Sequence, residues 1–400
     1  MTANQALEIA DQLAHPDAPG VPSTQPWWPQ SLAHGVPGIA LLHIELAAAG
    51  MRPWQRVQDW LAVAVRTPVT VGAGSSGPFY GAPALAHTLA CADRVRTGSY
   101  RTALAKLDAR IASDTRGRVE TAHARIASGD LPALAEFGTL RGLAGIGAYL
   151  LHRHPTGPTL RAILQYLVEL TRPITDATET LPGWWSPTGP TGQQEDDFPG
   201  GHANFGLAHG ISGPLALLAT ALRHDIAVSG QREAITALCT WIDHWRTPTS
   251  TTWPYLLRRC ELTNGTQPHP TPRPPSWCYG TAGQARTHQI AALATGDTQR
   301  QHMAENALIA ALSEPNLRAV TTDASLCHGY AGLARIAARA ATDAKQPTSE
   351  RLAELGRDLM QHAYTPTDPG LLEGTTGVAL SALTSTGVPP TGWDTCLLIA

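Results

Sequence analysis

Charged residues are scarce in this sequence: they make up 15% of its 400 residues, and the formal net charge at pH 7 is only -3. An average domain carries about 25% charged residues. A chain with so little excess charge has no general electrostatic reason to hold nucleic acid or an anionic membrane, so we expect neither as a partner. With 43% apolar residues, the chain can bury a large core.

Long apolar runs and targeting signals are missing as well. No uninterrupted apolar run reaches the roughly 20 residues that a membrane-spanning helix needs. The stretch from Met1 to Glu8 contains no basic segment followed by an apolar core, which a secretion signal would require. We therefore expect a cytoplasmic protein without a membrane span.

Cysteine is also sparse, with six residues in the whole chain. So few cysteines cannot form the disulfide scaffold of a secreted protein of this length. In a reducing compartment each one is expected to be a buried thiol, unless its neighbours indicate metal binding or catalysis. Four have no such neighbours: Cys91, Cys239, Cys260 and Cys396.

Glycine, in contrast, is frequent and regularly placed. A Gly-x-x-Gly motif followed by small apolar residues recurs along the chain, and one further copy has lost its second glycine. The shortest intervals between copies set a base period of about 45 residues, which fits one helical hairpin. The first glycines of the seven copies are Gly35, Gly81, Gly142, Gly210, Gly280, Gly329 and Gly374.

Each motif is expected to begin an inner helix, and the rest of the repeat is expected to form an amphipathic outer helix. Inner helices are predicted at, for example, 211–222 and 331–340, and outer helices at 57–65, 163–170, 235–245 and 352–362. Helical repeats can form an open solenoid or a closed ring. The charge-poor inner helices favour the ring, although a helical scaffold whose glycines serve packing alone would also explain the repeats.

Three intervals exceed the base period. The charged stretch 94–125 could be an inserted helical element or a small subdomain, at about 93–131. Residues 181–204 are rich in glycine and proline, and residues 247–276 in proline and threonine, so both are expected to be long loops. Loops of this length in a compact fold usually act as lids or binding surfaces.

Two cysteines and a histidine stand at equivalent points of successive copies. Cys278 precedes Gly280 by two residues, and Cys327 precedes Gly329 by two, with His328 between. Thiolate and imidazole are the ligands that zinc prefers, and three protein ligands leave a fourth position for water or substrate. The alternative is that the thiols are small buried hydrophobic groups. The next copy offers no fourth Cys or His, which favours an open, catalytic site.

His209 stands at the start of another copy, directly after the first long loop. A lone histidine is more often a structural group than a catalyst. At this point, however, a titratable imidazole could deliver or collect a proton.

Three motifs resemble those of the lanthionine synthetase C family, the LanC-like lanthipeptide cyclases. They are Gly206-Leu207-Ala208-His209-Gly210, Trp277-Cys278-Tyr279-Gly280 and Cys327-His328-Gly329. Together with the repeat glycines, the resemblance covers nearly the whole chain. It implies an all-α protein whose residues 1–400 form a single α,α-toroid, with seven inner and seven outer helices.

The same resemblance implies the chemistry. Zn²⁺ would be held by Cys278, Cys327 and His328, and a peptide cysteine would add intramolecularly to dehydroalanine or dehydrobutyrine. The products are the lanthionine and methyllanthionine rings of lanthipeptide antibiotics. His209 would be the acid, and Tyr279 and Trp277 would shape the pocket, with Tyr279 also a candidate catalytic residue.

The sequence departs from the family pattern at two positions. The aspartate expected four residues before Gly142 is Gly138, and the arginine expected four residues before Cys278 is Pro274, with Arg273 one place earlier. We keep Arg273 as a candidate catalytic residue. An acid could instead come from the first long loop, at Asp196 or Asp197.

The resemblance also implies partners: a dehydrated precursor peptide as substrate, a separate dehydratase and a transporter. Three other functions stay open. Zinc-dependent addition of a small thiol would use the same metal ligands, and a chain lacking the expected aspartate could be a non-catalytic, peptide-binding scaffold for the dehydratase complex. A glycan-processing toroid would need paired carboxylates at the repeat starts, which offer only Glu373.

Overall fold

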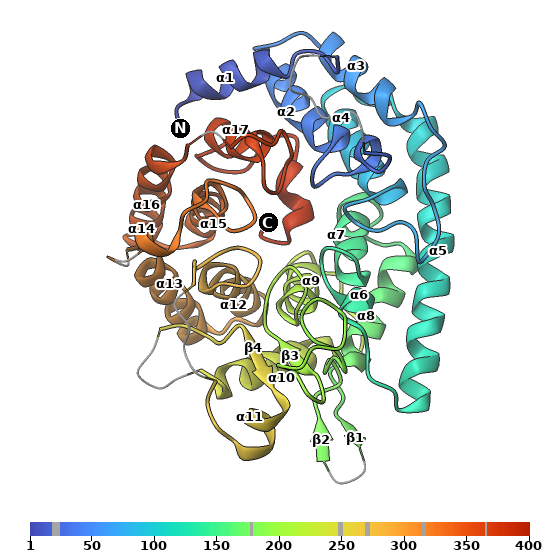
Figure 1. Ribbon diagram of the computed structural model, residues 1–400, viewed down its shortest axis with the longest axis vertical. Coiled ribbons are helices and arrows are strands. Elements are labelled where there is room, and N and C mark those ends of the chain that lie inside the picture. Colours follow the sequence, from blue (N-terminus) through green and yellow to red (C-terminus); the bar gives the residue numbers. More distant parts are fainter. Residues whose placement is uncertain are drawn as a thin grey trace. The chain divides into compact units, whose positions relative to one another are not determined.

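A computed structural model describes residues 1–17, 25–176, 179–246, 251–268, 273–313, 315, 317–364 and 366–400. These residues are mostly helical (Figure 1). None of the helices within them is long and apolar enough to cross a membrane. The chain divides into two compact units, unit 1 with Met1–Asp114 and Arg318–Cys396, and unit 2 with Thr115–Leu317 and Leu397–Ala400.

A helix begins in each glycine motif, as the sequence predicts. In six copies the first glycine is the N-cap and the helix begins at the next residue, whereas after Gly210 the N-cap is Ile211. These helices are buried over most of their length, as inner helices must be. Unit 1 contains α2 (Val36–Ala48), α4 (Ala82–Val95), α15 (Tyr330–Asp343) and α17 (Thr375–Leu383), and unit 2 contains α7 (Leu143–Arg153), α9 (Ser212–Arg223) and α12 (Thr281–Thr295).

The outer helices are amphipathic and pack on the inner helices that precede them. In α16, Leu352, Leu355 and Leu359 are buried while the opposite face is charged. The four outer helices that the sequence predicts are confirmed. In chain order the outer helices α3 (Gln55–Ala64), α8 (Pro158–Leu170), α10 (Gln231–His244), α13 (Thr298–Ser313) and α16 (Thr348–His362) pack on α2, α7, α9, α12 and α15.

Within unit 1 the first and last repeats are neighbours. Helix α1 (Ala3–Gln12) packs on α17, and α17 also packs on α2. The amino group of Met1 donates hydrogen bonds to the carbonyl groups of Met360 and Ala363. The two ends of an open solenoid would not meet in this way, so these contacts agree with the ring that the inner helices predict.

The charged segment between the second and third repeats is helical. Helix α5 (Arg101–Ser128) spans 28 residues of it without a break. That this helix is an insertion into the repeat stays a prediction.

The two segments expected to be loops contain short strands, which the sequence analysis missed. Strand β3 (His202–Asn204) pairs antiparallel with β4 (Leu256–Arg258), so the end of the first segment is joined to the second. A further antiparallel pair, β1 (Ile174–Asp176) and β2 (Glu179–Leu181), precedes the first loop. Residues 247–250 and 269–272 of the second loop lie outside the described residues.

Short helical elements complete the described structure. They are η1 (Trp28–Gln30), α6 (Leu134–Phe137), α11 (Arg259–Asn264), α14 (Leu317–Val320) and η2 (Trp393–Leu397).

A buried ion-pair network in unit 1 joins α15 to the C-terminal segment. The Asp394 carboxylate accepts hydrogen bonds from Nε of Arg335 at 2.8 Å and from Nε of Arg339 at 2.7 Å. The Arg335 and Asp394 side chains are 0% exposed. Burial acts to raise the pKa of Asp394, but the two arginines lower it to about 2. The network therefore depends on all of its members, because a buried charge that loses its partner is costly.

Candidate metal centre

Backbone hydrogen bonds hold together the loops that precede the inner helices, through the residue two places before each first glycine. In unit 2, the Leu140 N–H donates to the Ala208 carbonyl, and the Ala208 N–H to the Cys278 carbonyl, each at 3.1 Å. In unit 1, the Cys327 N–H donates to the Leu372 carbonyl at 2.9 Å. Cys278 and Cys327 therefore stand at the same point of their loops, and each is tied through its backbone to the loop of another repeat.

A serine four residues before the first glycine shapes each of these two loops. The Tyr279 N–H donates to Ser276 Oγ, and the His328 N–H to Ser325 Oγ, both at 3.4 Å. Ser276 Oγ also lies 3.4 Å from Cys278 Sγ. The hydroxyl group can therefore donate to a Cys278 thiolate and stabilise the form of the side chain that binds metal.

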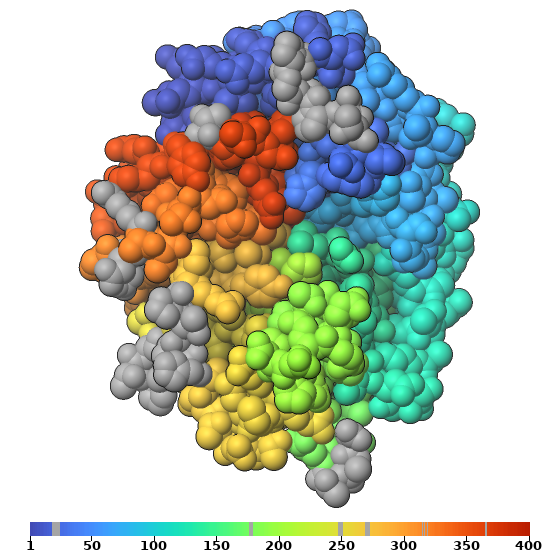
Figure 2. Space-filling view, in the orientation of Figure 1, coloured from blue at the N-terminus to red at the C-terminus, as the bar shows by residue number. Residues whose placement is uncertain are grey.

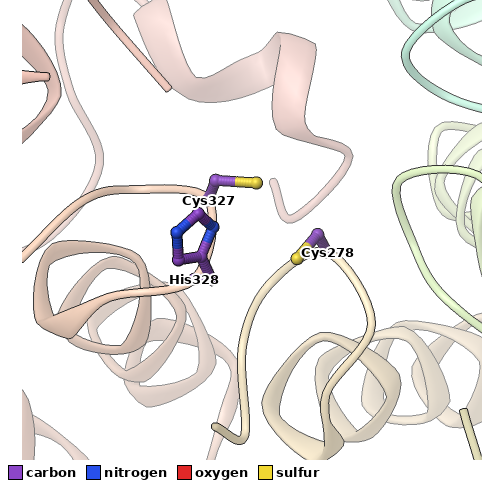
Figure 3. Close-up of side chains that lie close together, drawn as sticks. All are labelled: Cys278, Cys327 and His328. Carbon is purple, nitrogen blue, oxygen red and sulfur yellow. The ribbon is translucent and has the colours of Figure 1, made fainter. Parts of the chain in front are cut away.

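The two sulfurs of Cys278 and Cys327 and one ring nitrogen of His328 lie within 4.8 Å of one another. Figure 3 shows the three side chains close together. Ligand atoms of one tetrahedral zinc ion, with bonds of about 2.0–2.3 Å, are spaced on this scale. Among the residues that the structure describes, no carboxylate or further Cys or His belongs to this group. The donor set fits zinc, with one of four coordination positions left over.

Asp323, which the sequence analysis did not single out, contacts the histidine of this group within unit 1. Its Oδ2 lies 3.1 Å from Nε2 of His328, and its Oδ1 accepts a hydrogen bond from the Ser325 N–H. Partial burial acts to raise the pKa of Asp323, but the hydrogen bonds from His328 and Ser325 lower it to about 2. The side chain is therefore a carboxylate at neutral pH.

His209 lies in the loop that is hydrogen-bonded to the Cys278 carbonyl. Its ring is 5.8 Å, centroid to centroid, from the ring of Tyr279, at 31°. Burial, assisted by the positive charge of Arg141, lowers the pKa of His209 below its usual 6.5. The imidazole is therefore mostly neutral at pH 7 and can accept a proton.

Two glycines allow backbone segments to approach each other closely here. A Cβ at Gly206 would lie 2.5 Å from the Cys278 carbonyl oxygen and 2.9 Å from Cδ1 of Tyr279. A Cβ at Gly138, where the family pattern has aspartate, would lie 3.0 Å from the Leu134 carbonyl oxygen and 3.2 Å from that of His209. Position 138 therefore borders the His209 backbone.

Arg273 contacts an aromatic ring in the loop that leads to Cys278. Its guanidinium carbon lies 5.5 Å from the centre of the Tyr255 ring. Tyr255, which the sequence analysis missed, donates its hydroxyl hydrogen to the Pro274 carbonyl at 2.8 Å. Trp277 is buried and donates from Nε1 to the Leu397 carbonyl at 3.0 Å. Tyr255 thus fixes Pro274, and the hydrogen bond to Leu397 fixes Trp277, both in the segment that leads to Cys278.

Asp196 and Asp197 lie in an exposed part of the loop between β2 and β3. Figure 2 shows this segment in lime green as a raised patch on the surface. The Nε1 of Trp185 donates to the Gly200 carbonyl at 2.9 Å, which holds the base of the loop. That either aspartate supplies an acid to catalysis stays a prediction.

Comparisons with known proteins agree with the resemblance. A family model described as lanthionine synthetase C-like protein matches residues 26–398. Among solved structures, nisin cyclase is similar with a TM-score of 0.81 and 20% sequence identity, over 100% of this chain and 98% of that chain. This likeness shows the fold, the all-α α,α-toroid that the sequence predicts. A search of curated proteins finds no significant match.

Proposed function

The chain belongs to the lanthionine synthetase C-like protein family, and from this premise we propose that it is a zinc-dependent lanthipeptide cyclase. The observation that carries the proposal is the group of Cys278, Cys327 and His328, whose ligand atoms lie within 4.8 Å of one another. Thiolate and imidazole donors suit Zn²⁺, and three of them form an open site.

A zinc ion at this site would activate a substrate thiol. A free cysteine has a pKa near 8.5 and is mostly protonated at neutral pH. Zn²⁺ held by Cys278, Cys327 and His328 would supply a Lewis acid that favours the thiolate of a peptide cysteine. Cys278 and Cys327 bring two negative charges of their own, which leave the substrate sulfur electron-rich and nucleophilic.

In the proposed reaction, the sulfur of a peptide cysteine attacks the β-carbon of dehydroalanine or dehydrobutyrine in the same peptide. A C–S bond forms and the C=C π bond breaks, so the electron pair moves to the α-carbon side as an enolate. One proton leaves the thiol and one arrives at the α-carbon. The atoms therefore balance without a further reactant, and the product is lanthionine or methyllanthionine.

His209 is the proposed carrier of this proton. Because burial lowers its pKa, it is mostly neutral and can take the thiol proton. The resulting imidazolium is the acid that protonates the enolate. The Tyr279 ring beside it and the backbone bond from Ala208 to Cys278 support a place for His209 near the reacting sulfur. Arg273 remains a proposed catalytic residue because the family pattern has an arginine at the neighbouring position.

We propose a dehydrated precursor peptide as substrate, gripped by the long loops at 181–204 and 247–276. Its dehydro residues arise from serine and threonine by loss of water, which is a different reaction from ring closure. We propose that a separate dehydratase acts first and that a transporter exports the product. Gly138 in place of the family's aspartate favours a second candidate, a non-catalytic scaffold for the dehydratase complex. Addition of a small thiol would use the same metal ligands as the cyclase.

The test is ring closure itself. The zinc-loaded protein is incubated with a dehydrated peptide that contains one cysteine, and free thiol is titrated with a maleimide and counted by mass spectrometry. We expect thiol loss well above the rate without protein, with the peptide mass unchanged. A parallel reaction with free glutathione and a peptide lacking cysteine separates small-thiol addition. Peptide binding without thiol loss would indicate the scaffold function and contradict the cyclase.

A further inference from the structure

Three repeats share a side-chain turn that the glycine motif alone does not reveal. Six residues before the first glycine stand Asn204, Asp323 and Asp368. In each, Oδ1 accepts a hydrogen bond from the backbone N–H two residues further on, at Gly206, Ser325 and Gly370. In each, the backbone carbonyl accepts one from the N–H seven residues further on, at Ile211, Tyr330 and Thr375. The turn is a structural device of the repeat.

This turn needs only one side-chain oxygen. Asn204 makes it with an amide, so a carboxylate is not required. In the repeat that carries His328, the second oxygen of Asp323 has a different contact, because Oδ2 lies 3.1 Å from Nε2 of His328. In the next repeat the residue five places after Asp368 is Glu373, which has no ring nitrogen to contact.

We infer that Asp323 is a positioning residue that fixes His328 for metal binding. The Nε2–H of His328 donates to Oδ2, which places the ring proton on Nε2 and leaves the lone pair of Nδ1 for the metal. A carboxylate behind a ligating imidazole also raises its basicity and fixes the orientation of the ring. The inference rests on the metal site of the proposed function, and it assigns the ligand atom of His328 and the residue that selects it.

The decisive variant is Asp323→Asn, with Asp368→Asn as its matched control. Asparagine keeps the turn, as Asn204 shows, but it presents an amide N–H to Nε2 of His328. Nε2 must then accept, so the ring proton moves to Nδ1 and blocks that atom as a ligand. We expect Asp323→Asn to weaken zinc binding by about 10–100-fold. Asp368→Asn makes the same chemical change in a turn without a histidine and should leave zinc affinity unchanged.

Two measurements are made on each variant: zinc affinity by competition with a chelator, and the tautomer of His328 from ¹⁵N shifts of the ring in the metal-free protein. We expect Asp323→Asn alone to weaken zinc binding and to move the proton from Nε2 to Nδ1. An unchanged tautomer and affinity in Asp323→Asn, or an equal loss of affinity in Asp368→Asn, would overturn the inference.

The tautomer is measured without metal, so it tests the role of Asp323 even if the wild-type protein binds no zinc. Absence of zinc binding in the wild type would refute the proposed function, not the role of Asp323 in setting the tautomer. Should Asp323→Asn fail to fold, Asp323→Ser takes its place, because a serine hydroxyl can accept the same turn hydrogen bond. It removes the contact to Nε2, so we expect weaker zinc binding and a loss of the single Nε2–H tautomer. Retention of both would overturn the inference.

Discussion

Gly206→Ala tests the close contact between the His209 loop and the Cys278 loop. The added Cβ would lie 2.5 Å from the Cys278 carbonyl oxygen and 2.9 Å from Cδ1 of Tyr279, whereas ordinary contacts begin at 3.4 Å. The carbonyl oxygen belongs to the backbone and has no side-chain rotation to relieve the clash. The Cys278 loop must therefore move by about 1 Å, a displacement that can lower a rate by about 100-fold.

We expect Gly206→Ala to lower kcat/KM for ring closure by about 100-fold. Zinc binding should weaken as well, since Cys278 itself is displaced. Overpacking should also cost about 1–3 kcal/mol in the free energy of unfolding. Chelator competition, the thiol-loss assay at saturating zinc and urea unfolding measure the three effects.

Gly117→Ala is the matched control, because a Cβ at Gly117 in α5 meets nothing within 4 Å. It makes the same chemical change without a clash, and we expect no change in zinc binding or kcat/KM. Wild-type zinc affinity and wild-type kcat/KM in Gly206→Ala would refute the close packing of the two loops on which the site depends.

Three further predictions concern proton transfer, pH and the buried ion pairs. His209→Asn should reduce the cyclisation rate by about 100–10,000-fold while metal analysis finds zinc unchanged; loss of the metal would contradict a role confined to proton transfer. Breaking the buried network with Asp394→Asn should cost about 3–5 kcal/mol in urea unfolding, since Arg335 and Arg339 lose their counter-charge; a cost near zero would contradict the network. Acid should destabilise the fold because the unfolded chain binds protons on histidine at pH values where the folded chain does not. The free energy of unfolding is at its full value above pH 6.5 and falls between pH 6.5 and 4, by up to about 3 kcal/mol for each buried histidine. A constant free energy of unfolding over this pH range, measured by urea unfolding, would contradict the prediction. The groups are three histidines whose pKa burial lowers to about 4: His43, His87 and His288.

The helical repeat could be predicted from the sequence because its signal is local. Each inner helix begins directly after the first glycine of a motif, or two residues after it at Gly210, and the amphipathic period marks the outer helices. The pairing of β3 with β4 could not be predicted. Strands of three residues carry no usable alternation, and their partner lies about 50 residues away along the chain.

The metal ligands could be singled out because Cys278 and Cys327 share a place in the repeat. Asp323 was missed, although a signal was present: Asn204, Asp323 and Asp368 all stand six residues before a repeat glycine. Tyr255 had no such signal. It lies in an irregular loop, and its link to the site is a hydrogen bond to the Pro274 carbonyl, which depends on tertiary structure.

Metal analysis of purified protein tests the central claim most directly. Wild-type protein and the variants Cys278→Ala and Cys260→Ala are dialysed against zinc and then against zinc-free buffer. The zinc bound per chain is then measured by inductively coupled plasma mass spectrometry. Cys260 lies outside the motif and serves as the matched control; it is exposed, so the expectation of a buried thiol is wrong at this position. The account predicts one zinc per chain in the wild type and in Cys260→Ala, and none in Cys278→Ala. A full zinc content in Cys278→Ala, or none in the wild type, would contradict it.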